Sequence, residues 1–157
     1  MKILLIKPPL NRNLLVPNHD EPLELEYLAA AAAGHVVRIL DMRIDANLDR
    51  ALSRFRPDLA GITAYTCDYH ASLSVLQEIK KFDKRIETAV GGHHATVLTA
   101  DFALPLVDAI FLGAPIVLAR PWDTRRTAVF GRWLTSEERW ILCWRPAHRQ
   151  VTHRQWK

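Results

Sequence analysis

Over residues 1–113, short apolar runs alternate five times with segments whose apolar residues recur at helical spacing. The runs lie at 3–6, 36–40, 59–64, 86–90 and 107–112. They are rich in β-branched residues, which is typical of strands that are buried on both faces. No other sequence feature restricts the fold as strongly, because a chain with this rhythm builds βαβ units.

Helical patterns fill the intervals between these runs. Residues 23–33 are rich in Leu, Ala and Glu and stop at Gly34, and residues 48–55 stop before Pro57. Residues 73–81 end in two lysines, and a short helical stretch covers 97–102. Since crossovers between parallel strands are right-handed, the helices must cover both faces of one sheet. We therefore expect a doubly wound α/β domain with five parallel strands over residues 1–113.

Charge divides the chain near Gly113. Residues 1–113 carry 12 Lys or Arg against 14 Asp or Glu, whereas residues 114–157 carry nine against three and hold all five tryptophans. We expect 114–157 to be an irregular basic tail, and three interpretations stay open. The tail is the product of a shifted reading frame, a basic arm that binds nucleic acid through Arg and Trp, or a final helix around 133–142 that covers the sheet.

Several classes of protein are excluded. No apolar run reaches the roughly 20 residues of a membrane helix or the length of a secretory signal. Cys67 and Cys143 stand far apart, which favours a reduced, cytoplasmic protein. No spacing of His, Cys, Asp or Glu indicates a metal site built from side chains. Cys67 is interpreted either as a thiol with a lowered pKa at a helix start or as a buried, unreactive side chain.

Ligands of doubly wound sheets bind beyond the carboxyl ends of the strands, so residues there are the candidates. Gly91 and Gly92 follow the fourth run and either admit a ligand or simply form a tight turn. Thr63 and Thr66 offer hydroxyls nearby. No phosphate-binding glycine loop is present, because prolines follow the first run.

These stretches together resemble the N-terminal cobalamin-binding domain of cobalamin-dependent radical SAM enzymes. The matching segments lie in order at residues 1–9, 25–30, 34–41, 55–59, 61–66, 90–96 and 107–113. The resemblance implies a flavodoxin-like fold, cobalamin as cofactor, and a cleft lined by the glycine pair and by hydroxyls after the third strand. It makes Thr63, Thr66, Gly91 and Gly92 the cofactor-binding candidates, with Tyr65 and His93 as additions.

The chain departs from related proteins in two respects. The D-x-H-x-x-G motif that supplies a cobalt ligand is missing, and His19 lies in a different context, so we expect cobalamin without a protein histidine ligand. Asp68-Tyr69-His70 is interpreted as a helix N-cap. A radical SAM domain needs three closely spaced cysteines for its iron–sulfur cluster, and this chain has two isolated ones.

We therefore expect a truncated cobalamin-binding module that presents the corrinoid to a separate radical SAM catalytic domain of the methyltransferase or cyclase type. Its only metal is the cobalt of the cofactor, and no complete active site is present in the chain. Two alternatives remain: a nucleic-acid-associated protein that uses its basic tail, and a flavodoxin-like regulatory or interaction domain without a cofactor.

Overall fold

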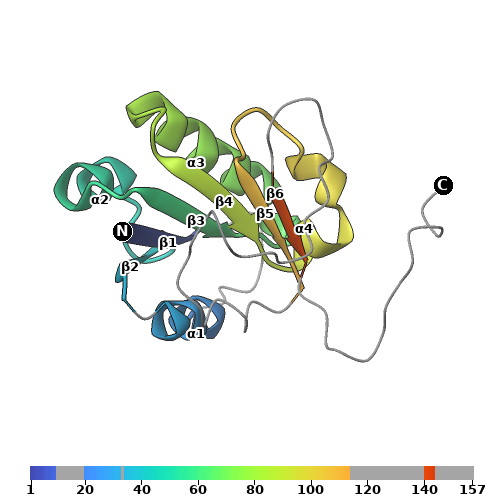
Figure 1. Ribbon diagram of the computed structural model, residues 1–157, viewed down its shortest axis with the longest axis horizontal. Helices are drawn as coiled ribbons and strands as arrows, with labels where there is room; N and C mark the ends of the chain where they lie inside the picture. Colours follow the sequence, from blue (N-terminus) through green and yellow to red (C-terminus); the bar gives the residue numbers. More distant parts are fainter. Residues whose placement is uncertain (10–19, 33, 114–139, 144–157) are drawn as a thin grey trace.

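The computed structural model describes residues 1–9, 20–32, 34–113 and 140–143 (Figure 1). Strands and helices alternate as the apolar runs predict. In chain order the elements are β1 (Lys2–Lys7), α1 (Leu23–Ala31), β2 (Val36–Asp41), α2 (Leu48–Phe55), β3 (Leu59–Thr63), the 3₁₀ turn η1 (Thr66–Asp68), α3 (Tyr69–Phe82), β4 (Glu87–Gly91), α4 (His93–Val97), the 3₁₀ turn η2 (Thr99–Phe102), β5 (Ala109–Leu112) and β6 (Trp140–Cys143).

The strands form one parallel sheet with the order β2-β1-β3-β4-β5-β6. Its first five strands have the order of flavodoxin-like folds, in which the direction of winding reverses between β1 and β3. The expected doubly wound α/β fold is therefore confirmed. None of the described helices is long and apolar enough to cross a membrane.

The sixth strand comes from the segment that the sequence separates as a tail. Residues 140–143 pair with β5 in parallel, with Ile110 opposite Ile141. The interpretation of 133–142 as a covering helix is therefore wrong for residues 140–142, which are extended. The Arg- and Trp-rich stretch that motivates the nucleic-acid hypothesis lies almost wholly outside the described residues.

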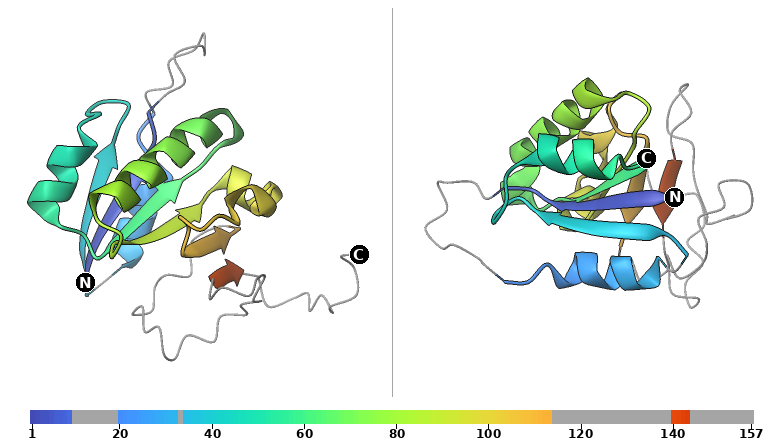
Figure 2. Two further views of the ribbon diagram at one scale, coloured as in Figure 1. Left: turned by 90° about the horizontal axis from the view of Figure 1, so that it is seen from above. Right: turned by 90° about the vertical axis from the view of Figure 1, so that its left-hand side faces the viewer.

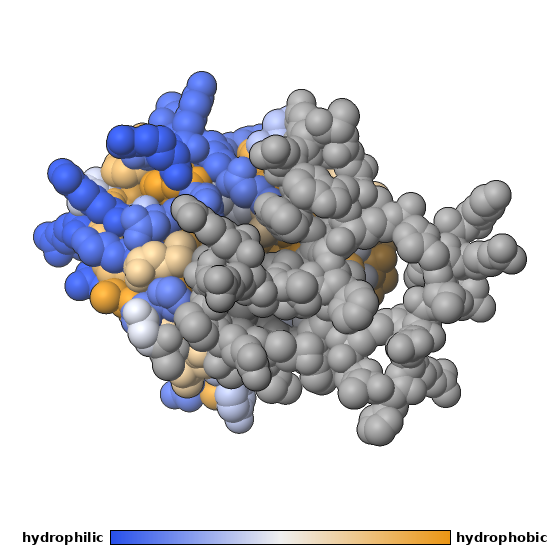
Figure 3. Space-filling model, in the orientation of Figure 1, coloured by the Kyte–Doolittle hydropathy of each residue, from blue (hydrophilic) through white to orange (hydrophobic). Residues whose placement is uncertain are grey.

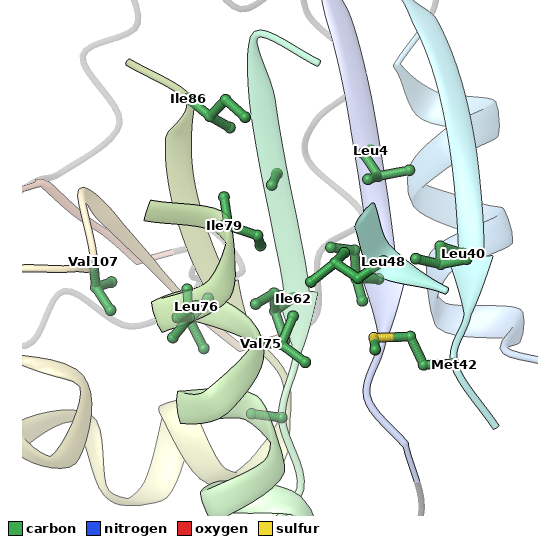
Figure 4. Packing of buried hydrophobic residues seen from close by; sticks show 14 of the residues in the cluster. Leu4, Leu40, Met42, Leu48, Ile62, Val75, Leu76, Ile79, Ile86 and Val107 are labelled. Carbon is green, nitrogen blue, oxygen red and sulfur yellow. The ribbon is translucent and has the colours of Figure 1, made fainter. Parts of the chain in front are cut away.

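Helices cover both faces of the sheet, but unequally (Figure 2). On one face lie α2, α3 and α4 with η2, and on the other, among the described residues, lies α1. The larger core fills the first face, and ten of its residues are labelled in Figure 4. Hydrophilic residues gather on the outer surface of α2 and α3 (Figure 3). The first face is consequently a closed apolar layer.

Local signals set the ends of α2. Its N-cap residue, Asn47, accepts a hydrogen bond from the Arg50 backbone N–H at 2.9 Å. At the other end Arg56 takes a left-handed conformation with φ 49° just before Pro57. Because the residue before a proline avoids the helical region, α2 ends there and the chain turns into β3.

A polar cluster ties α3 to the start of β4 and β5. The Asp108 carboxylate accepts hydrogen bonds from Lys80 Nζ at 2.6 Å and from the Thr88 backbone N–H at 2.7 Å. Burial raises the pKa of Asp108, but the bonds from Lys80 and Thr88 outweigh it, so the net pKa is lowered.

Replacing Asp108 with Asn is expected to lower the free energy of unfolding by about 1 kcal/mol at pH 7, a modest value because the carboxylate is partly exposed. A lowered folded-state pKa stabilises the fold above the unfolded pKa of about 4, and the effect is lost as pH falls through the folded-state pKa. The gap between wild type and D108N in urea denaturation should therefore narrow below about pH 4. A gap that is independent of pH would contradict this account.

Candidate cofactor site

The carboxyl ends of β1 and β3 meet at the point where the winding of the sheet reverses. Lys7 ends β1, and Tyr65 follows β3. Lys7 Nζ donates to Glu24 Oε1 of α1 at 2.5 Å and lies 4.4 Å from the centre of the Tyr65 ring. The edge where ligands of this fold bind therefore carries a lysine that is held between a carboxylate and an aromatic ring.

A cavity of about 140 Å³ opens on the α1 face of the sheet, between the strands and the helix. Most of its wall is apolar, with a few polar side chains. It is lined by Ile3, Leu5, Glu24, Leu25, Leu28, Ala32, His35, Leu59, Gly61, Ile62, Thr63, Tyr65, Ala89, Gly91, Gly92, Phe111 and Gly113. His35 adds a buried ring nitrogen, Nε2, that has no hydrogen-bond partner among the described residues.

Small residues on alternate positions of β3 and β4 create this hollow. Gly61 pairs with Ala89, and Thr63 pairs with Gly91, so the small side chains stand next to each other on one face. The residues between them, Ile62 and Val90, point to the opposite face and are almost fully buried there. One face of the same strands is thus filled and the other is left open.

Glycine occupies positions 91 and 92 for two different physical reasons. Gly92 has φ 98° and ψ −174°, a conformation that is essentially restricted to glycine. A Cβ at Gly92 would lie 2.8 Å from the Ala64 carbonyl oxygen. A Cβ at Gly91 would lie 3.5 Å from Phe111 Cβ, an ordinary contact. Gly92 is required by the chain's own backbone, whereas Gly91 leaves open space on the cavity side.

The structure brings four of the six candidate residues to this cavity: Thr63, Tyr65, Gly91 and Gly92. Thr63 is buried and Tyr65 is 40% exposed at the rim. The other two candidates, Thr66 and His93, do not line the cavity but lie exposed at the same edge.

The neighbour of His93 has the more specific environment. His94 is 3% exposed, its Nδ1 lies 3.1 Å from Thr66 Oγ1, and its Nε2 lies 3.1 Å from Asp101 Oδ2. Because adjacent residues of a helix point in different directions, the sequence alone could not tell which histidine faces Thr66.

The structure also describes Cys67 and Asp68, which are interpreted above from the sequence. The lowered thiol pKa expected at Cys67 is wrong, because desolvation together with nearby Asp68 raises the pKa. The expected burial is also wrong, because Cys67 is exposed, whereas the raised pKa agrees with an unreactive thiol. Asp68 is the N-cap residue of α3, yet its side chain makes no capping hydrogen bond. His19 lies outside the described residues. Within the described ranges, no group of three or more His, Cys, Asp or Glu is arranged to hold a metal ion.

Residues 16–118 match the family model described as "B12 binding domain". The chain belongs to the B12-binding domain family. The cobalamin-binding family expected from the sequence is thereby confirmed, and the cofactor class that this family binds is a corrinoid.

Two curated proteins are similar to the chain. An uncharacterized methyltransferase of Pyrococcus horikoshii, PH0819, is 30% identical over 123 residues, which are 72% of this chain and 27% of that protein. A hopanoid C-3 methylase of Methylococcus capsulatus is 32% identical over 89 residues, which are 52% of this chain and 17% of that protein. The chain thus spans between about a sixth and a quarter of these relatives.

The two glycines should respond differently to the same small substitution. Gly92→Ala is expected to lower the free energy of unfolding by about 2 kcal/mol, because it combines a strained backbone with a clash against Ala64. Gly91→Ala should change the free energy by less than about 1 kcal/mol, since its Cβ makes an ordinary contact. Urea denaturation of both variants measures the difference, and equal losses would refute the separate roles.

Proposed function

We propose that this B12-binding domain holds cobalamin with the nucleotide tail in the cavity beside α1 and the corrin ring at the carboxyl edge of β1, β3 and β4. The domain would present the cofactor to a radical SAM catalytic domain that transfers methyl groups. The hollow made by Gly61, Ala89 and Gly91 on the α1 face carries this proposal.

The size of the cavity favours the tail over the ring. An apolar cavity of about 150 Å³ accommodates one aromatic ring, and the cavity here is about 140 Å³. The base at the end of the nucleotide tail, a flat group of two fused aromatic rings, is near this size, whereas the corrin macrocycle is far larger. The macrocycle would therefore remain outside, where Tyr65 and His93 are exposed.

Polar groups at the mouth and in the wall fit a tail that is not wholly apolar. Buried Thr63 lines the cavity, Tyr65 stands at its rim, and Lys7 lies against the Tyr65 ring with Glu24 as its partner. The tail carries a phosphodiester, which suits a nearby lysine. The unpartnered His35 Nε2 in the wall offers one more hydrogen-bonding group.

When bound, cobalamin supplies a cobalt centre that carries and releases methyl groups. The chain's own residues would bind and orient the cofactor and exclude water from the tail. We assign no histidine of this chain as a cobalt ligand, because the D-x-H-x-x-G motif is absent. The names of both relatives, a methyltransferase and a methylase, support methyl transfer as the activity of the larger protein.

Filling the cavity from β4 tests where the tail binds. Gly91→Val should weaken binding of hydroxocobalamin at least about tenfold. The valine methyl groups occupy space on the cavity side, so the nucleotide tail can enter only if the surrounding side chains shift. Valine suits a strand, so the fold should persist. Cobinamide, which has the corrin ring but no nucleotide tail, should bind wild type and G91V equally. Absorption titrations with both corrinoids give the affinities.

Ala100→Val serves as the matched control, since Ala100 is exposed and does not line the cavity. It should leave both affinities unchanged. Wild-type affinity of G91V for cobalamin would contradict the placement of the tail. Failure of the wild-type chain to bind either corrinoid would contradict the proposed function as a whole.

The link to a radical SAM domain has its own test at the level of the gene. The DNA that follows the codon of Gly113, translated in all three frames, should encode three cysteines with the spacing C-x-x-x-C-x-x-C, the pattern that holds an iron–sulfur cluster. Absence of that pattern from every frame and from adjacent genes would remove the proposed partner.

A further inference from the structure

A chain of three polar side chains runs from the cofactor edge into the core and out again. Thr66 is exposed just after β3, His94 of α4 is buried, and the side chain of Asp101 in η2 is 42% exposed. The His94 ring lies 3.1 Å from the hydroxyl on one side and 3.1 Å from the carboxylate on the other.

The environment of His94 fixes the ring. Its backbone N–H donates to the Ala64 carbonyl at 3.0 Å, which ties α4 to the end of β3. The ring packs against Tyr69 and Phe102, with centroid distances of 4.9 and 5.5 Å. A side chain held on all these sides keeps one orientation, so the hydroxyl bonded to it is oriented as well.

The partners of His94 determine the direction of each hydrogen bond. A carboxylate only accepts, so Nε2 of the ring carries the proton that is donated to Asp101. In a neutral imidazole the other nitrogen, Nδ1, then has a free lone pair. With the ring in this neutral form, the Thr66 hydroxyl donates its single proton to that lone pair. Its oxygen is consequently left with lone pairs only, and these can accept a hydrogen bond at the cofactor edge.

We infer that Thr66 is a hydrogen-bond acceptor for the amide side chains of the corrin ring, and that His94 and Asp101 are positioning residues that hold its hydroxyl in this orientation. The inference rests on the proposed function, because it needs the ring at this edge. It adds a buried residue that would affect cofactor affinity without reaching the cofactor.

Four variants test the arrangement by absorption titration with hydroxocobalamin and with cobinamide. Thr66→Val should weaken binding of both corrinoids about fivefold, which corresponds to the loss of one net hydrogen bond. Thr66→Ser keeps the hydroxyl and should bind both corrinoids with wild-type affinity. His94→Phe should cause the same loss, since Phe fits beside Tyr69 and Phe102 but cannot orient Thr66. The double variant T66V/H94F should lose no more than either single variant.

The results separate this inference from the proposed function. Because cobinamide keeps the ring amides, T66V and H94F should affect both ligands, whereas Gly91→Val should affect only cobalamin. If T66V binds both corrinoids with wild-type affinity, the inference is overturned, whatever affinity H94F shows. Additive losses in the double variant, or wild-type affinity of a folded H94F, overturn the positioning role. Binding of neither corrinoid by the wild-type chain overturns the inference together with the proposed function.

Discussion

The close approach of Gly92 to Ala64 holds the carboxyl edge of the sheet together. Ala64 donates its backbone N–H to the Gly91 carbonyl at 2.8 Å, and its own carbonyl accepts from the His94 backbone at 3.0 Å. A Cβ on Gly92 would collide with Ala64, so only glycine allows both bonds. These bonds place the end of β3 beside the start of α4. The cavity mouth and the Thr66–His94 pair both depend on that placement.

The two faces of the sheet divide stability and binding between them. The face beneath α2 and α3 carries the larger core, with Leu52, Leu76 and Ile79 fully buried. The α1 face has a smaller cluster around Leu25 and a hollow where Gly61 and Gly91 face the helix. Since close packing elsewhere supplies the folding free energy, this face can keep unfilled volume that a larger side chain would otherwise occupy.

The apolar runs and the helix stops at Gly34 and Pro57 predicted the sheet and the helices, because runs rich in β-branched residues alternate in order with segments of helical spacing. The cavity could not be predicted from the sequence in the same way. Gly61 stands next to Ala89 only through the register of β3 and β4, which no local pattern specifies. For the same reason the segment 140–143 could not be distinguished from a helix, since four apolar residues fit either element and only pairing with β5 decides.

On the proposed function, the domain contacts its cofactor in two independent ways. The cavity selects by volume, because Gly91 and Ala89 leave room for one aromatic group, while the edge selects by hydrogen bonding through Thr66. A cofactor held by its tail keeps its macrocycle near the edge at high effective concentration, so weak contacts there suffice. Tight anchoring and an open ring face are therefore compatible, and an open ring face is what a separate catalytic domain needs in order to reach the cobalt.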